Sequence, residues 1–91
     1  METSDIVLSL RGHDAGHAMF VLATDGEYLL LADGKRRRVE RPKRKKIKHV
    51  QFLINSDCRV ACKLRSGEKI TNNELRRALN DFREQHQPPI V

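Results

Sequence analysis

The chain has 91 residues, 38% of them apolar, and a formal net charge of +6. This length predicts one domain with a small core. No apolar run approaches the roughly 18 residues that a membrane span needs. The N-terminus carries two acids and no basic start, which is not typical of a signal peptide, so we expect a cytoplasmic monomer without membrane contact.

The positive charge is concentrated in one stretch of the chain. Residues 35–48 contain ten lysines and arginines against the single acid Glu40, so they carry +9. The remaining 77 residues sum to −3. A basic segment on a mildly acidic body is the electrostatic pattern of a protein that binds a polyanion.

The first two-thirds of the chain predicts short strands separated by turns. Apolar residues alternate over 6–10, which places Ile6, Leu8 and Leu10 on one face and Ser9 on the other. A second, strongly apolar strand is expected over 18–24.

Two Asp-Gly pairs, at 25–26 and 33–34, are typical of hairpin turns. They predict a third strand over 27–32 and a fourth over 35–40, with Pro42 ending the fourth. A fifth strand is expected over 50–54, with Val50, Phe52 and Ile54 on one face.

Five short strands with tight turns predict a small closed or half-closed β-barrel over 5–55, after a flexible N-terminus over 1–4. A helical extension is then expected over 56–86, followed by a frayed tail over 87–91. The fold class is therefore mostly β with C-terminal helices, one short and one longer.

The short helix would be capped by Ser56 or Asp57 and would run to about Arg65. For the longer helix, Thr71 and Glu74 have the spacing of a capping box. Ile70 and Leu75 stand at the positions of a hydrophobic staple. The apolar stripe of this helix is formed by Leu75, Ala78, Leu79 and Phe82.

Catalytic signals in the sequence are weak. His13, Asp14 and His17 could form an acid–base or metal site, but a capping aspartate between solvated histidines is the favoured interpretation. Cys58 and Cys62 are interpreted as reduced thiols packed near a helix, with redox or metal chemistry as the alternative. We therefore expect no enzyme, no metal and no cofactor.

The basic stretch has several interpretations, including a solvated face, a disordered arm, a localisation signal or a site for an acidic protein. Nucleic-acid binding is favoured because the stretch lies between two apolar strands, Val39 and Ile47 could anchor it, and Pro42 would stiffen it. Only one tyrosine and three phenylalanines are present, so single-strand stacking is poorly supported. Recognition of folded or double-helical RNA fits better.

The loop sequence SLRGHDAGH over 9–17, followed by the apolar strand MFVL, resembles the KOW motif. The block over 31–50 and the helix region from Gly67 resemble the continuation found in small bacterial KOW-domain RNA-binding proteins. Those proteins are similar to a KOW-bearing ribosomal protein of the archaeal and eukaryotic large subunit. The resemblance covers about residues 5–84.

This resemblance implies an SH3-like barrel that binds structured RNA, such as ribosomal RNA, through its first loop and a basic hairpin over 35–48. Gly16 would be the glycine that lets the backbone turn close to the ligand. Ala15 and His17 stand where basic residues are common in such loops, which suggests that affinity depends mainly on 35–48.

Fifteen residues are the candidates for RNA contact, from the loop and from the basic stretch. They are Arg11, Gly12, His13, Gly16, His17, Lys35, Arg36, Arg38, Arg41, Lys43, Arg44, Lys45, Lys46, Lys48 and His49. The alternative function is a protein-interaction module that binds an acidic partner of the transcription or translation machinery. Binding to duplex DNA shares the same electrostatics and stays open.

Overall fold

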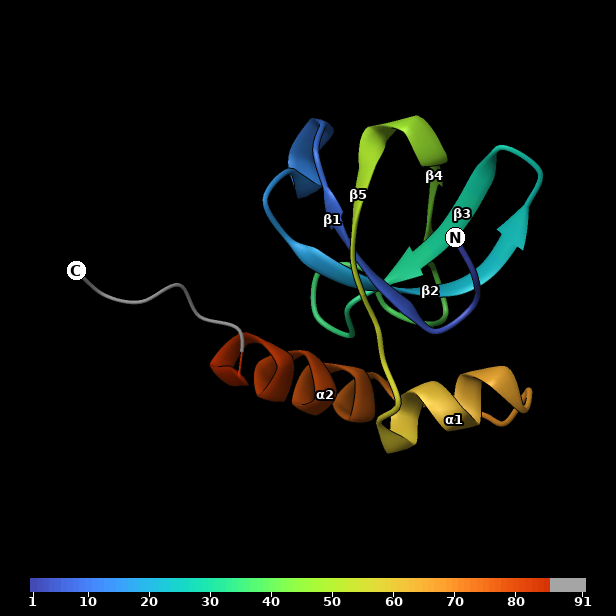
Figure 1. Ribbon diagram of the computed structural model, residues 1–91, viewed down its shortest axis with the longest axis vertical. Helices are drawn as coiled ribbons and strands as arrows, with labels where there is room; N and C mark the ends of the chain where they lie inside the picture. Colours follow the sequence, from blue (N-terminus) through green and yellow to red (C-terminus); the bar gives the residue numbers. More distant parts are fainter. Residues whose placement is uncertain (86–91) are drawn as a thin grey trace.

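A computed structural model describes residues 1–85 and shows a five-stranded antiparallel sheet followed by two helices (Figure 1). The expected order of strands before helices is confirmed. The elements are β1 (Asp5–Ser9), η1 (Gly12–Asp14), β2 (Ala18–Asp25), β3 (Tyr28–Ala32), β4 (Lys43–Lys46), η2 (Ile47–His49), β5 (Val50–Asn55), α1 (Arg59–Arg65) and α2 (Asn72–Gln85), where η is a 3₁₀ turn. The predicted tail over 87–91, and residue 86 of the predicted extension, lie outside the described residues.

The strand order is β4-β3-β2-β1-β5, so the two outer strands are consecutive in sequence. The η2 turn connects them and is held at both ends. The Ile47 N–H donates to Glu27 O at 2.8 Å, and the Leu10 N–H donates to His49 O at 3.0 Å. No ladder joins β4 to β5 in the described part of the chain, so the sheet is not closed into a barrel.

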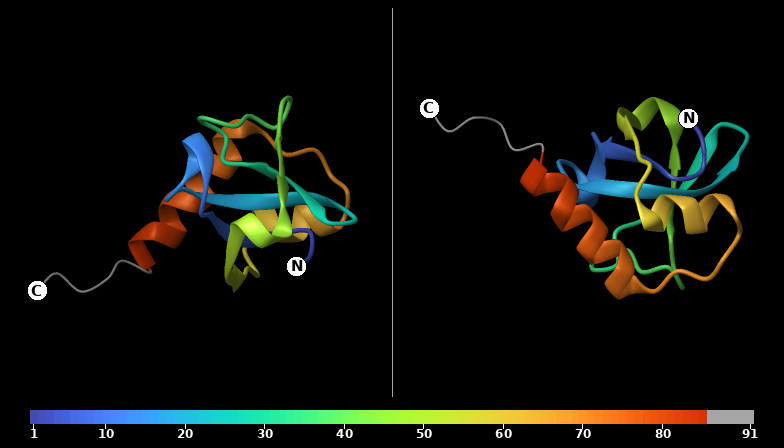
Figure 2. Two further views of the ribbon diagram at one scale, coloured as in Figure 1. Left: turned by 90° about the horizontal axis from the view of Figure 1, so that it is seen from above. Right: turned by 60° about the horizontal axis from the view of Figure 1, so that its bottom comes forward.

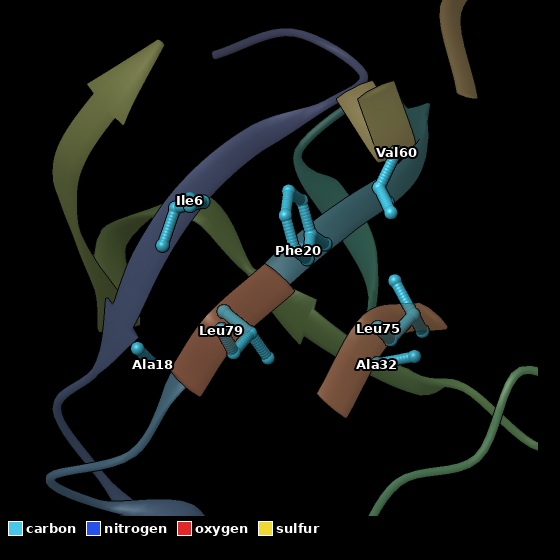
Figure 3. Packing of buried hydrophobic residues seen from close by; sticks show 7 residues of the cluster. All are labelled: Ile6, Ala18, Phe20, Ala32, Val60, Leu75 and Leu79. Atoms are coloured by element: carbon cyan, nitrogen blue, oxygen red, sulfur yellow. The ribbon is translucent and has the colours of Figure 1, made fainter. Parts of the chain in front are cut away.

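The curved sheet buries apolar residues on both of its faces. On one face, Phe20 and Ile6 pack against α1 and α2 through Val60, Leu75 and Leu79 (Figure 3). The other face has its own buried cluster, made of Val7, Met19, Val21, Leu29, Leu31 and Val50. Both helices lie along the same end of the sheet (Figures 1 and 2).

The predicted single face of Val50, Phe52 and Ile54 in β5 is wrong, and burial in β1 does not follow the predicted apolar face. Ser9 is buried, while Leu10 and Phe52 are each 48% exposed. Strict alternation fails because neighbouring β1 residues, Ile6 and Val7, belong to different buried clusters and are both covered. The pairing of β1 with β5 also shifts register between these two residues, which changes the parity of β5.

The predicted fourth strand over 35–40 is also wrong. Residues 33–42 form a loop, and β4 lies at Lys43–Lys46, directly after Pro42. The second Asp-Gly pair is therefore not a two-residue hairpin turn. The other strands lie within one or two residues of their predicted positions.

The longer helix begins as the sequence predicts. The Glu74 N–H donates to Thr71 Oγ1 at 3.1 Å, and the Thr71 N–H donates to Glu74 Oε1 at 3.2 Å, which confirms the capping box. Ile70 packs beside the buried Leu75 as a staple. Neither helix among residues 1–85 is long and apolar enough to cross a membrane.

The short helix differs from the prediction at its start. Cys58, not Ser56 or Asp57, is its N-cap residue, and no side-chain cap is formed. Cys58 and Cys62 are both free and exposed, so the interpretation of these cysteines as packing residues is wrong. At the start of the chain, where flexibility is predicted, Ser4 is buried and its N–H donates to Val21 O at 2.8 Å.

Candidate nucleic-acid interface

The loop over 33–42 is organised by the buried carboxylate of Asp33. Its Oδ1 accepts the N–H groups of Lys35, Arg36 and Arg37, each at 2.9 Å. The Asp33 N–H in turn donates to Arg37 O at 2.9 Å. These bonds fold the backbone into a compact turn. The aspartate side chain in this way satisfies N–H groups that would otherwise pair with a neighbouring strand. The basic side chains are therefore presented by a folded loop.

Helix α2 holds this loop against the body of the protein. The Asn72 side chain accepts the Val39 N–H at 2.8 Å and donates to the Glu40 carboxylate at 2.8 Å. The Arg76 guanidinium donates to Gly34 O at 2.8 Å. Val39 also packs against the apolar cluster beneath α2, as the sequence predicts. The Asn72 bond holds the pKa of Glu40 below its ordinary value.

Gly34 is where the loop comes closest to the helix. It is buried and adopts φ of +80°, and a Cβ atom there would lie 2.2 Å from Asn72 O. No L side chain fits without moving the loop or the helix. Glycine at this position is required both by the backbone conformation and by the close approach.

The first loop and the basic stretch meet through an ion pair. Arg37 Nη2 lies 3.1 Å from Asp14 Oδ2, and Arg37 Nε donates to both oxygens of that carboxylate at 3.2 Å. Burial alone would raise the pKa of Asp14, but Arg37, with the ammonium groups of Lys45 and Lys43, lowers it below its ordinary value. Asp14 is therefore an ion-paired residue within η1 and not its N-cap. It links the two predicted contact regions.

Lys45 is a second link between the same regions. It is only 8% exposed, and its ammonium donates to Ser9 Oγ and, at 2.6 Å, to Arg11 O. Burial lowers the pKa of Lys45, and the positive charges of Lys43 and Arg37 lower it further. The negative charge of Asp14 acts in the opposite direction but does not cancel these effects. Lys45 was predicted to contact RNA, but its charge is used inside the protein.

The side chains of β4 divide between two sides of the strand. Lys43 and Lys45 are on the side of Asp14, whose carboxyl group both of them influence. On the other side, the Arg44 guanidinium stacks 3.7 Å from the centroid of the Tyr28 ring and lies 3.5 Å from Asp25. Lys46 is also over this ring, at 5.8 Å. The predicted β4 contacts therefore do not converge on one surface.

The η2 turn brings Lys48 and His49 close to Arg11 of the first loop. The pKa of His49 is lowered below its ordinary value, first by burial and then by the positive charges of Arg11, Lys48, Lys46 and Lys45. Repulsion of this kind shows a local excess of cations that the described part of the protein does not neutralise.

Five cations of the basic stretch form no side-chain hydrogen bond or salt bridge within residues 1–85. They are Lys35, Arg36, Arg38, Arg41 and Lys48. All five are exposed. Arg11, Gly12, His13 and Gly16 are also exposed, and His17 is half-buried. These residues form the accessible part of the predicted site.

Helix α2 contributes basic residues that the prediction of contact residues missed. A hollow of about 530 Å³ is lined by Gly16, His17, Asp33, Lys35, Arg36, Arg76, Asn80 and Arg83. The sequence contains a signal for it, since residues 76, 80 and 83 repeat at i, i+4 and i+7 beside the apolar stripe.

Metal binding finds no support among residues 1–85, where no group of three histidine, cysteine or acidic side chains could hold an ion. The cluster of His13, Asp14 and His17 instead consists of an ion-paired aspartate, an exposed His13 and a half-buried His17. Comparison of the sequence with models of protein families and with curated proteins finds no match.

Proposed function

We propose that the protein is a non-enzymatic RNA-binding domain that recognises structured RNA, such as ribosomal RNA or the ribosome itself. The observation that carries the proposal is the folded loop over 33–42, which presents the exposed side chains of Lys35, Arg36, Arg38 and Arg41. Carboxylates near this surface are already engaged, since Asp14 is paired with Arg37 and Asp33 accepts backbone N–H groups. The resulting positive field would attract phosphates.

The shape of the sheet supports a finer proposal, that it is an SH3-like barrel of the KOW type. Its outer strands are consecutive, and η2, which connects them, is hydrogen bonded to both β1 and β3 ends. The KOW-like loop, residues 9–17, lies beside the basic stretch through the Asp14–Arg37 and Lys45–Arg11 contacts. A single RNA surface can therefore touch both.

The chemistry favours recognition of shape over recognition of bases. The accessible groups are guanidinium and ammonium groups, and the contacts that such groups make to phosphates carry no sequence information. Tyr28, the aromatic ring next to the basic strand, already stacks with Arg44. Folded RNA, which presents phosphates at fixed spacings, is the ligand class that fits.

Replacing three exposed loop arginines tests this proposal. The variant R36Q/R38Q/R41Q should bind structured RNA at least tenfold more weakly, because it removes about three phosphate contacts. The matched control R59Q/K69Q/R77Q removes the same charge from exposed positions outside the interface and should change affinity little. Equal losses in both variants would show that only net charge matters and would contradict the proposal.

A second candidate function is docking on a protein partner. It is favoured by a hollow of about 620 Å³ between β5 and the two helices, where apolar residues such as Ile54, Val60 and Ala78 lie beside charged residues of both signs, such as Arg77 and Asp81. Co-purification with and without nuclease discriminates the candidates. Nuclease would release a partner tethered through RNA and would leave a directly bound protein in place.

A further inference from the structure

The hollow beside α2 has a composition suited to an anionic ligand. Four cationic side chains, Lys35, Arg36, Arg76 and Arg83, line it together with His17, and they face a single carboxylate. Its volume of about 530 Å³ lies within the range of roughly 300–1,000 Å³ that is usual for ligand sites.

The one carboxylate in this hollow does not neutralise the cations. Asp33 Oδ1 accepts three backbone N–H groups of its own loop, and Asp33 is buried. Arg76 gives one hydrogen bond to Gly34 O, which fixes its position and leaves most of its five donors available. Arg83 donates to Asn80 Oδ1 at 3.0 Å and is exposed.

The donors that remain belong to side chains. The loop N–H groups of Lys35, Arg36 and Arg37 are occupied by Asp33, so they are not available to a ligand. Guanidinium groups form forked hydrogen bonds with phosphate oxygens. The hollow is thus suited to phosphate groups.

The hollow is continuous with the proposed RNA interface. Lys35 and Arg36 belong to the basic loop, and Gly16 and His17 belong to the KOW-like loop. Helix α2 passes beside both loops in the two views of Figure 2. A phosphodiester backbone that crosses the loops would reach the helix residues at 76, 80 and 83.

Resting on the proposed function, we propose that α2 forms the second wall of the RNA site. Arg36 and Arg83 contact consecutive parts of the same sugar–phosphate backbone across the hollow. Arg76 has a positioning role through Gly34 in addition to its charge. The C-terminal helix is in this way part of the ligand site as well as a cover for the apolar core.

The test compares two arginines on the same helix. R83Q should weaken binding of structured RNA about fivefold and should reduce the slope of log affinity against log salt by about 1. Arg77 is equally exposed but lines the other hollow, so R77Q is the matched control and should leave both quantities nearly unchanged. Both side chains are exposed, and far-ultraviolet circular dichroism would verify that both variants fold.

A double-mutant cycle measures the coupling between two substitutions, which a change of net charge alone does not produce. R36Q and R83Q should be non-additive if both side chains hold one backbone, while R36Q and R77Q should be additive. Equal effects of R83Q and R77Q, with normal RNA binding by the unaltered protein, would overturn the α2 wall and leave the proposed function standing. No RNA binding by the unaltered protein would overturn both proposals.

Discussion

Arg37 and Lys45 show that basic residues in one stretch can have opposite uses. Both charges point toward Asp14 or the first loop, and both are hydrogen bonded within the protein. Arg36 and Arg38, the neighbours of Arg37, are exposed and form no side-chain hydrogen bond or salt bridge among residues 1–85. Within the basic stretch, the proposed interface therefore consists mainly of cations that the fold does not use.

The Asp14–Arg37 pair predicts an acid-sensitive stability. D14N should lower the free energy of unfolding at pH 7 by about 1–3 kcal/mol, because the buried carboxylate loses its charged hydrogen bonds to the half-buried Arg37. The pKa of Asp14 is lowered in the folded protein, so its contribution is complete above the ordinary aspartate value of about 4. The stabilising contribution of Asp14 is lost as pH falls through the lower pKa that it has in the folded protein.

Urea unfolding of D14N and of the unaltered protein at neutral and at acidic pH would measure this difference. The gap between the two proteins should narrow as the solution becomes more acidic than about pH 4. D81N, at an exposed carboxylate of α2, is the control and should change stability by less than about 0.5 kcal/mol. A gap that stays constant with pH would contradict the assignment.

His49 predicts that RNA binding takes up a proton. Burial and neighbouring cations lower its pKa in the free protein. Phosphates would offset the charges of Arg11 and Lys48, so bound RNA should raise this pKa. RNA affinity should then increase as pH falls through the pKa of His49 in the complex. The increase should be complete once pH is below the pKa of His49 in the free protein.

Nuclear magnetic resonance titration of the imidazole signals, with and without structured RNA, would follow each histidine separately. This resolution is needed because His13 and His17 lie in the same region. H49Q should remove the His49 part of the pH dependence. A His49 pKa that RNA leaves unchanged would place the η2 turn outside the interface.

At the scale of elements, the basic loop depends on α2 for its conformation. G34A should destabilise the protein strongly, because the added Cβ would meet Asn72 O at 2.2 Å and Leu75 Cβ at 3.1 Å. G26A is the matched control, since Gly26 also has positive φ, +60°, but its Cβ would meet nothing within 4 Å. Both variants share a conformational cost of about 1–2 kcal/mol.

Denaturant unfolding of the two glycine variants isolates the packing contribution. G34A should lose at least about 2 kcal/mol more than G26A, the size expected for overpacking a close contact. Similar losses would mean that the loop and the helix separate easily. The account of a loop held by α2 would then be wrong.

The elements that could be predicted are those with local signals. Thr71 and Glu74 define the start of α2 through a contact three residues apart, and Val50 to Ile54 is a run of strand-forming residues. β4 could not be predicted in this way, because its sequence KRKK has no strand preference. Its position is determined by pairing with β3, in which Leu29 faces Lys45.

The candidate site was predictable in its composition but not in its geometry. Charge density identified the stretch over 35–48, and the loop resemblance identified 9–17. The sequence could not show that Asp33 folds the loop or that Lys45 turns inward, because both depend on distant partners. For Arg83 the sequence shows only that it shares a helix face with residues 76 and 80, because the hollow itself exists only when α2 lies beside the two loops.

At the scale of the molecule, the charged groups that are bonded within the protein are separate from the cations that are exposed to solvent. The two apolar clusters occupy the faces of the sheet, and α1 and α2 cover one of them. The basic loop, the KOW-like loop and one flank of α2 share a single border of the protein. A ligand with regularly spaced phosphates would contact all three without any rearrangement of the core.

Salt-dependent binding of the purified protein to structured ribosomal RNA, duplex DNA and an acidic polypeptide, measured in parallel, tests the central claim most directly. If about five cations engage phosphates, log affinity should fall against log salt with a slope on the order of −4. We expect a preference of tens of fold for structured RNA that persists near physiological salt. Equal affinity for all three polyanions, with equally steep slopes, would show only a basic surface and would contradict recognition of RNA shape.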